Sequence, residues 1–479
     1  MSAFKRIAAI SAVISASAGC AVMPLDEAAD AAAGRVLAIT AVGPEWPPDA
    51  GDTTAAPEIR APLTLPAALA LAFTRNPGIR RQYARLGIAH ADLQKAARIA
   101  NPTLSLAWLH PNDGTRDQVT RGISASFADL LLLPSRRRLS AAEFHRVELA
   151  VAAELVALAQ EVEAAWYAHV GALQIASMRD AVARAAGDEA VLAQRFHEAG
   201  NISRLQLDLQ LAESARARID ALRAHSDAAG SRLRFANQLG LWVGADWQTV
   251  DRLPAIPQAR LSRDELLAQA LAQRLDLASV REEVSLLEDA LRVTQSWRLL
   301  GSVDAGYERE RETDGSKLRG PTLSLELPLF NQGQGAVERA EALLLDASTR
   351  RDALTLAVEN EVSAGIERLE LARAASEHYR DALLPSTASA VARRQERVNF
   401  MLESVFELIR ARRGEYDAWQ AYLESVRDYW IARTDLRAAV SGPLPGDEEP
   451  AAPTIGVNEI IEPAVSPDAS EHMHHGEQP

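Results

Sequence analysis

The sequence of 479 residues is poor in several kinds of residue, and each shortage excludes something. It has a single cysteine, Cys20, which excludes a disulfide framework and a cysteine-based zinc site. Aromatic residues make up only 5%, and alanine, leucine, arginine and glutamate dominate, as in long helices rather than β-rich globules. After the N-terminal segment no run of about 18 apolar residues occurs, so no transmembrane helix is predicted. The formal net charge of −14 argues against nucleic acid as a partner.

Motifs of common catalytic sites are also missing. The sequence contains neither a glycine-rich phosphate loop nor a His-Glu-x-x-His zinc motif. Seven histidines occur singly, and the many acidic residues fit solvated helix faces. These histidines are His90, His110, His145, His169, His197, His225 and His378. We therefore expect no enzyme, no catalytic residue and no cofactor.

The N-terminus has the pattern of a secretory signal. Lys5 and Arg6 precede an apolar stretch and then small residues, which predicts a lipoprotein-type signal peptide at 1–19. The segment Ser17–Cys20 resembles a bacterial lipobox, so we expect lipidation at Cys20, although Ser17 replaces the usual leucine. Ordinary cleavage after Ala18 is the alternative. Val22, by resemblance to lipoprotein sorting rules, favours the outer membrane.

The rest of the sequence indicates an internal duplication, in which the same order of helices and strands occurs twice. The segment that begins at Leu63 matches the one that begins at Leu261, and Ala199–Ile202 falls opposite Val398–Met401, so the offset is about 199 residues. Two prolines within 242–260 mark the join. The predicted organisation is an extended tether at 20–62, a first repeat at 63–241, a linker at 242–260, a second repeat at 261–440 and a disordered acidic tail at 441–479.

Each copy carries two candidate strands, recognised by alternation of apolar and polar residues. The apolar members of the four strands are Leu104, Leu106 and Trp108; Ile123, Ala125 and Phe127; Val303, Ala305 and Tyr307; and Leu323, Leu325, Leu327 and Leu329. An apolar outer face with a polar inner face is what a lipid-spanning barrel with a wet lumen requires. Two surface hairpins on a soluble domain are the alternative.

Two very long helices follow the strands in each copy. No proline occurs from about Arg138 to Glu198, and apolar residues recur at heptad-like spacing there and in the second copy. The predicted seam positions include Val151, Leu155 and Val162, Val358 and Val362 of the second copy, and Leu205, Ile219, Leu222 and Leu233 of the first return helix. Helices of that length suit a tunnel rather than a compact domain. Four strands cannot close a barrel, and an open edge in lipid leaves unpaired backbone groups, so several chains must share one barrel.

These segments resemble the TolC-like outer-membrane efflux proteins. Leu323–Gly335 resembles the fourth barrel strand and helix entry of that family, and Glu198–Ala212 resembles its helix-hairpin tip. The first copy departs from the family at Ser126–Arg138, where the usual Pro-Leu-Phe-Gly step is missing, so its second strand is expected to end differently.

The resemblance implies a mainly α fold with a β-barrel portion. Four membrane strands per chain would form a twelve-stranded barrel in a homotrimer, above a long α-helical periplasmic barrel. It further implies a lipid-anchored channel in the outer membrane that works with a periplasmic adaptor protein and an inner-membrane RND-type transporter. The exported substrate is left open between metal ions and drugs. A secretion duct for proteins and a structural periplasmic coiled-coil lipoprotein are the alternatives.

Two sets of residues are candidate functional sites. His472, Met473, His474 and His475 supply imidazole and thioether groups that suit copper or silver, with a solvated tail of chance histidines as the alternative.

The second candidate site is a gate. The resemblance implies that the helix tips constrict the tunnel, where family members carry two acids in the second copy. Glu407 takes the first acid position, Arg410 replaces the second, and Asp208 matches in the first copy. We expect either a ring of three Glu407 carboxylates that attracts cations or a Glu407–Arg410 pair that holds the tips shut. Exposed charges at a helix end are the alternative.

Overall fold

A computed structural model describes residues 24–44, 59, 61–112, 116–242, 244–299, 301–447 and 453–461. Cys20 and the His472–His475 tract therefore lie outside the described residues, as does the first-copy turn at Asp113–Gly114. The chain divides into two compact units. The first comprises Met1–Arg35, Arg81–Ala153 and Leu275–Leu356, and the second comprises Val36–Arg80, Glu154–Arg274 and Ala357–Pro479.

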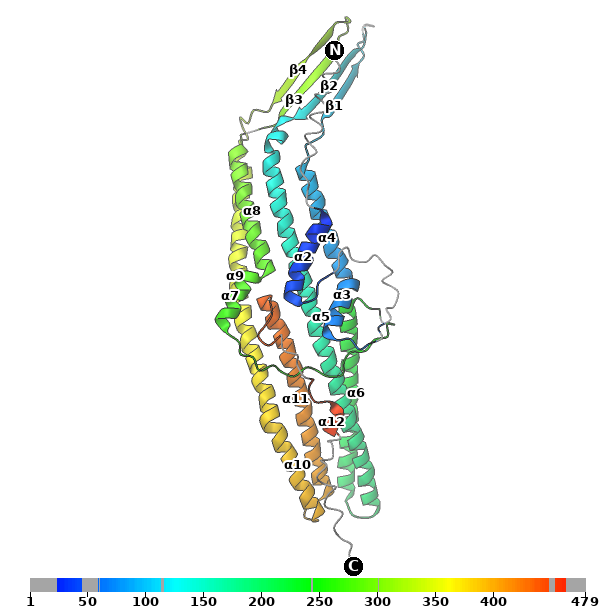
Figure 1. Ribbon diagram of the computed structural model, residues 1–479. Coiled ribbons are helices and arrows are strands. Elements are labelled where there is room, and N and C mark those ends of the chain that lie inside the picture. Colours follow the sequence, from blue (N-terminus) through cyan, green and yellow to red (C-terminus); the bar gives the residue numbers. More distant parts are fainter. Residues whose placement is uncertain are drawn as a thin grey trace, which may run out of the picture. The chain divides into compact units, whose positions relative to one another are not determined.

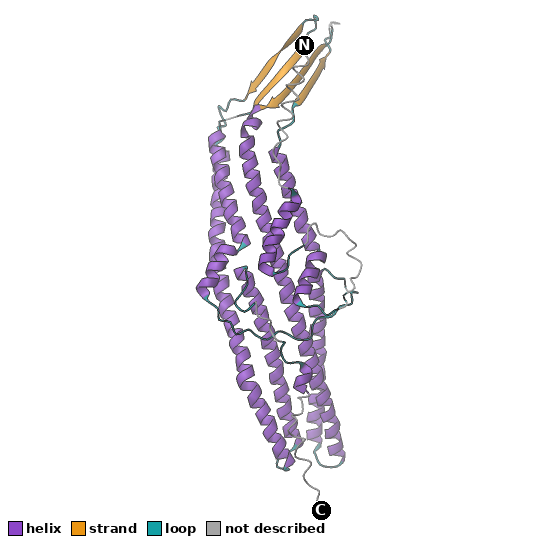
Figure 2. Cartoon of the chain, in the orientation of Figure 1, coloured by secondary structure: helices purple, strands orange, loops and turns teal. Residues whose placement is uncertain are grey.

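The first unit contains a four-stranded antiparallel sheet in the order β1-β2-β3-β4 (Figures 1 and 2). Its strands are β1 (Thr103–Leu109), β2 (Gln118–Ser126), β3 (Val303–Arg311) and β4 (Lys317–Leu325). It also contains most of α4 (Pro77–Ala97), all of α8 (Leu275–Trp297), and the first parts of α2 (Leu25–Thr40), α5 (Phe127–Glu198) and α9 (Gln334–His378). Helices lead into the sheet from α4 and α8 and leave it as α5 and α9, as the duplicated plan predicts.

The second unit is helical. It holds α3 (Leu65–Arg75), α6 (Arg204–Leu239), α7 (Arg263–Gln273), the π-helical turn η1 (Tyr379–Leu383), α10 (Leu384–Asn399), α11 (Val405–Val440) and α12 (Val457–Ile461), with the remaining parts of α2, α4, α5 and α9. Two helical hairpins organise it. The α5 segment runs beside α6, and α10 runs beside α11 (Figure 1).

The seam positions predicted from heptad spacing are largely buried. Val151, Leu155 and Val162 of α5 have almost no exposed surface, and the same is true of Val358 and Val362 of α9. The predicted positions on α6 behave differently, because Leu205, Leu222 and Leu233 are more than half exposed. The seam residues of α5 are therefore buried within one chain, whereas most of the seam residues of α6 remain exposed.

Specific residues set where the long helices start, bend and end. Ser203 caps α6 in a capping box with Gln206. Gly240 closes α6 in the left-handed region at φ 71°, and a Cβ there would lie 2.7 Å from the Arg75 carbonyl oxygen. In the second copy Pro385 stands in the first turn of α10. Because proline has no N–H to donate, η1 precedes it and divides the second-copy helix into α9 and α10.

Three predicted boundaries are wrong. The expected extended tether at 20–62 contains α2, a 16-residue helix in which Ala28, Ala29, Ala32 and Val36 are fully buried, so packing of a small-residue stripe overrides the composition. Helix α5 starts at Phe127 rather than near Arg138, with Pro134 inside it. Strand β4 ends at Leu325, so Leu327 and Leu329 of the predicted alternation lie beyond it.

The predicted disordered tail is ordered over residues 441–447 and 453–461. Thr454 pairs with Leu253 through its backbone N–H at 2.9 Å and its hydroxyl at 2.8 Å. Val457 and Ile460 of α12 pack with Met178 of α5 and Leu423 of α11 in one apolar cluster. The composition predicted disorder because the tail is rich in acids and prolines. The few apolar residues Val457 and Ile460 are nevertheless buried against α5 and α11, and this burial orders the segment. We call residues 441–447 and 453–461 the strap.

Candidate functional site

The two faces of the sheet differ in character. The strand register brings together Leu104, Ile123, Tyr307 and Pro321 in one row across all four strands, and Ala125, Ala305 and Leu323 in the next. These side chains share one face, which we call the apolar face, and most are exposed. The opposite face, the polar face, carries Ser105, Thr120, Ser124, Asp304, Glu308, Thr322 and Ser324. The predicted alternation is confirmed within the four strands.

The sheet also has two open edges. Within the described residues β1 pairs only with β2, and β4 pairs only with β3. In the first copy β2 ends at Ser126 and α5 begins at the next residue, where the Ser126 hydroxyl accepts a hydrogen bond from the Asp129 N–H at 3.2 Å. This direct strand-to-helix step replaces the missing Pro-Leu-Phe-Gly segment, so the expectation of a different strand end is confirmed.

At the tip of the second-copy hairpin the Glu407 carboxylate is neutralised by two arginines. Arg410 donates to it at 2.9 and 3.2 Å, and Arg394 of α10 donates to it at 3.0 Å. Arg394 and Arg397 also lie 3.8 and 3.5 Å from Glu403. The pairing of Glu407 with Arg410 is therefore present. These five side chains carry one more positive than negative charge, so Glu407 is not a bare carboxylate within one chain; the ring of three stays a prediction.

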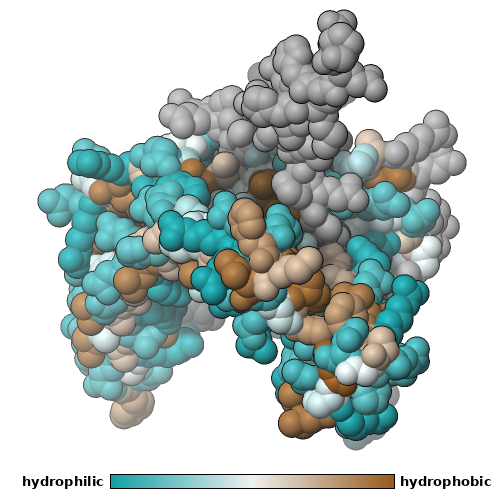
Figure 3. All heavy atoms as spheres, turned by 90° about the horizontal axis from the view of Figure 1, so that it is seen from below, coloured by the Kyte–Doolittle hydropathy of each residue, from teal (hydrophilic) through white to brown (hydrophobic). Residues whose placement is uncertain are grey.

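The first-copy tip holds Asp208 in a simpler setting. Asp208 lies one turn after Arg204, which approaches it at 3.0 Å, and both side chains are well exposed. The structure does not bring Asp208 into the same cluster as Glu407. Nearby apolar residues are exposed at both tips, with Leu205 at 69% and Met401 at 93%. Seen from below (Figure 3), the surface is mainly hydrophilic, with apolar side chains gathered in separate patches.

Away from the tips, a pair of salt bridges connects α11 of the second hairpin with α5 and α6 of the first hairpin. Arg413 of α11 donates to Glu189 of α5 at 3.0 Å and to Glu213 of α6 at 2.9 Å. Burial raises the pKa of Glu189, and Arg413 opposes that effect. One guanidinium thus joins the two helical hairpins, a contact that no sequence pattern indicated because Arg413 is 200 residues from Glu213 and 224 residues from Glu189.

A buried ionic cluster anchors the strap. Arg433 of α11, fully buried, donates to Asp447 at 2.7 Å and to the Tyr429 hydroxyl at 3.3 Å. Arg437, one turn later, donates to Asp447 at 2.9 Å and to Glu163 of α5 at 2.7 Å. Burial alone would raise the pKa of Asp447, but Arg437 and Arg433 outweigh it and hold that pKa below its usual range. The sequence signal for this cluster was a pair of arginines four residues apart near the end of α11, followed ten residues later by Asp447.

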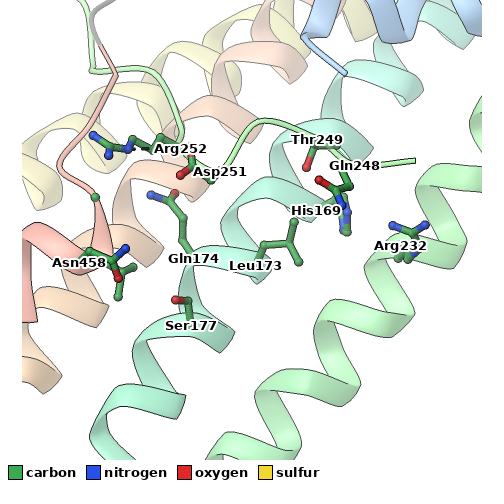
Figure 4. A pocket seen from close by; sticks show the side chains of 12 residues that line it. His169, Leu173, Gln174, Ser177, Arg232, Gln248, Thr249, Asp251, Arg252 and Asn458 are labelled. Carbon is green, nitrogen blue, oxygen red and sulfur yellow. Dashed lines mark ion pairs between the residues drawn. The ribbon is translucent and has the colours of Figure 1, made fainter. Parts of the chain in front are cut away.

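A cavity of about 310 Å³ lies beside α5, α6 and the strap (Figure 4). His169, Leu173 and Gln174 line it from α5, with Arg232 of α6 near one end (Figure 4). Burial, and to a smaller extent the positive charge of Arg232, lower the pKa of His169 to about 4. The Gln174 amide nitrogen and the Thr249 hydroxyl are buried without a hydrogen-bond partner among the described residues.

Neither a membrane-crossing helix nor a metal-binding cluster emerges from the part of the chain that the structure describes. No described helix is long and apolar enough to cross a membrane. No group of three or more His, Cys, Asp or Glu side chains is placed to hold a metal ion within those residues.

Comparison with known proteins gives one kind of match. No family model and no curated protein matches the sequence. Solved structures do match: CusC has a TM-score of 0.66 at 16% identity, covering 84% of this chain and 99% of that one. The Campylobacter jejuni CmeC outer membrane channel has a TM-score of 0.65 at 12% identity, covering 84% and 94%. The open state of the Neisseria gonorrhoeae MtrE outer membrane channel has a TM-score of 0.64 at 14% identity, covering 80% and 90%. The chain therefore has the fold of the TolC-like outer-membrane channels.

Proposed function

We propose that this chain is the outer-membrane channel subunit of a tripartite efflux pump and conducts substrates from the periplasm to the exterior. The observation that carries the proposal is the four-stranded sheet, with one exposed apolar face, one polar face and two unpaired edges. A sheet of this kind is stable in lipid only when other copies pair with both edges. Its polar face then lines water.

The proposed assembly is a homotrimer that shares one barrel of twelve strands above a helical tunnel. The number three comes from the likeness to the TolC-like channels. The exposed apolar residues of α6 support an oligomer, because they follow the heptad-like spacing of a helix seam yet lie at the surface of the part of the chain that the structure describes. They are Leu205, Leu209, Ile219, Leu222 and Leu233.

The partners are a periplasmic adaptor protein and an inner-membrane RND-type transporter, with the channel anchored by a lipid on Cys20. The proposal of lipidation predicts that Cys20→Ser abolishes labelling by a palmitate analogue. Labelling that survives this change would refute the lipid anchor without affecting the channel.

Conductance separates the channel from its structural alternative. The purified full-length protein in planar bilayers should give discrete conductance steps, whereas a coiled-coil lipoprotein without a pore should give none. An absence of steps from protein that is folded and trimeric would overturn the proposal. A secretion duct for proteins would also conduct, and it is distinguished by translocation of a protein substrate.

We further propose that the charged cluster of the second tip holds the tunnel closed. Arg394 and Arg410 both bind Glu407, and the contact of Arg394 fixes α10 against the start of α11. Glu407→Gln should weaken both contacts and raise the open probability, and Asp208→Asn tests the candidate of the first-copy tip, where it removes the exposed pair with Arg204. Equal conductance and ion preference in both variants and in the wild type would show that these residues do not line the gate.

Metal export is the second candidate for the substrate, and it rests on His472, Met473, His474 and His475. Deletion of residues 471–479 should lower copper or silver tolerance if the tract takes part. Unchanged tolerance would leave drugs as the candidate substrate class.

A further inference from the structure

Three arginines face one another across neighbouring strands near the loop end of the sheet. Arg121 of β2 is directly opposite Arg309 of β3, and Arg309 is directly opposite Arg319 of β4. All three side chains are exposed. Directly opposite residues in antiparallel strands have Cβ atoms about 4.5–5.5 Å apart, and like charges at such positions destabilise the sheet. The row therefore carries a repulsion that an anion would relieve.

The next row on the same face adds two more cations. Arg311 of β3 is directly opposite Lys317 of β4, and both are exposed. Because alternate residues point to opposite faces, the acids that interleave with these cations on β3 lie on the polar face. No carboxylate of the described residues is within ion-pair distance of any of the five cations. We call Arg121, Arg309, Arg311, Lys317 and Arg319 the basic belt.

The basic belt lies on the apolar face, directly beside its apolar rows. The row that holds Ile123, Tyr307 and Pro321 is the one adjacent to the arginine row, roughly 7 Å away along the strands. Arginine stems can lie on apolar surface while their guanidiniums reach polar headgroups. An apolar surface edged by cations is the pattern expected where a protein leaves the hydrocarbon and meets anionic headgroups.

We propose that the basic belt binds the phosphate groups of phosphorylated lipids in the leaflet next to the sheet's loops. The inference rests on the proposed function, because it needs the apolar face to lie in lipid. Guanidinium forks match phosphate oxygens in pairs, and arginine is favoured over lysine for this contact. Strands lie about 4.8 Å apart, so three arginines in register span roughly 10 Å and suit a lipid with more than one phosphate.

The test measures lipid binding by the full-length protein in phosphatidylcholine vesicles that contain either diphosphorylated or dephosphorylated lipid A. Wild-type protein should bind the diphosphorylated form at least about tenfold more tightly. Arg309→Gln removes the central guanidinium and should weaken that binding about tenfold or more. The triple variant Arg121→Gln, Arg309→Gln and Arg319→Gln should bind the two lipids equally. Arg339→Gln on α9 removes an exposed charge outside the sheet and should leave binding unchanged.

Conductance measured in the same vesicles separates the two proposals. Channels that conduct but bind both lipids equally would overturn the basic belt and leave the channel intact. Phosphate-dependent binding by a protein that does not conduct would support the basic belt and refute the channel. Competition by inorganic phosphate at the concentration of the lipid would also overturn the proposal, since it would indicate a site for free anions.

Discussion

Replacement of Asp447 by asparagine should release the strap. Asp447 is the only described carboxylate that contacts Arg433, whose side chain is 1% exposed, and it also binds Arg437. Asparagine keeps the shape but removes the charge. The change therefore leaves a fully buried guanidinium without its counter-charge.

The expected magnitude follows from this burial. Removing one partner of a buried ion pair costs roughly 3–5 kcal/mol, because the remaining charge stays desolvated. That free energy corresponds to a change of roughly two to three and a half orders of magnitude in the equilibrium for local opening. An exposed pair is different: Asp428, 58% exposed beside Arg427, should contribute less than about 1 kcal/mol. Asp428→Asn on the same helix is therefore the matched control.

Amide hydrogen exchange in the strap measures this opening. The Leu444 N–H donates to Asp447 at 2.7 Å, and the Thr454 N–H donates to the Leu253 carbonyl at 2.9 Å, so both should exchange much faster in Asp447→Asn. Asp428→Asn should exchange at nearly the wild-type rate. Less than tenfold acceleration in Asp447→Asn would refute the view that this carboxylate anchors the strap.

The same contact should depend on pH. The pKa of Asp447 is lower in the folded chain than its unfolded value of about 3.9, so its charge stabilises the strap above that value. As the pH falls through the lowered pKa, the carboxylate is protonated and this stability is lost. Strap protection should therefore decline only below about pH 4, and Asp447→Asn should lack that decline.

Two further predictions concern the sheet and a helix end. Leu323→Arg puts a charge on the apolar face and should cost about 2–4 kcal/mol near the bilayer midplane, whereas Thr322→Arg on the polar face should be tolerated; equal loss of membrane-inserted oligomer from both would contradict the assigned faces. Gly240→Ala should destabilise the chain by about 1–3 kcal/mol, because φ is positive and the Arg75 carbonyl oxygen lies 2.7 Å from the new Cβ. Gly187→Ala in α5 meets no atom within 4 Å and should stabilise by about 0.5–1 kcal/mol, so thermal unfolding that moves both variants in the same direction would refute the strain at Gly240.

The sequence by itself determined the features that depend on local periodicity. Alternation over a few residues identified both strand pairs and the face of each side chain, and proline-free heptad-like spacing identified the long helices. The pairing of Glu407 with Arg410 was equally accessible, because residues three apart on a helix are neighbours whatever the rest of the chain does. The boundaries were less accurate, as Phe127 and Leu325 show, because alternation does not state where hydrogen-bonded pairing stops.

Tertiary structure alone decided the contacts between distant segments. The arginine row exists only because the register sets Arg121 opposite Arg309, and a shift of one residue would have sent these side chains to different faces. Arg413 and Asp447 likewise acquire their roles from partners brought close by packing. Composition predicted a disordered tail, but a segment is ordered when the surface it buries outweighs its lost chain entropy, and that surface belongs to residues far away in the sequence.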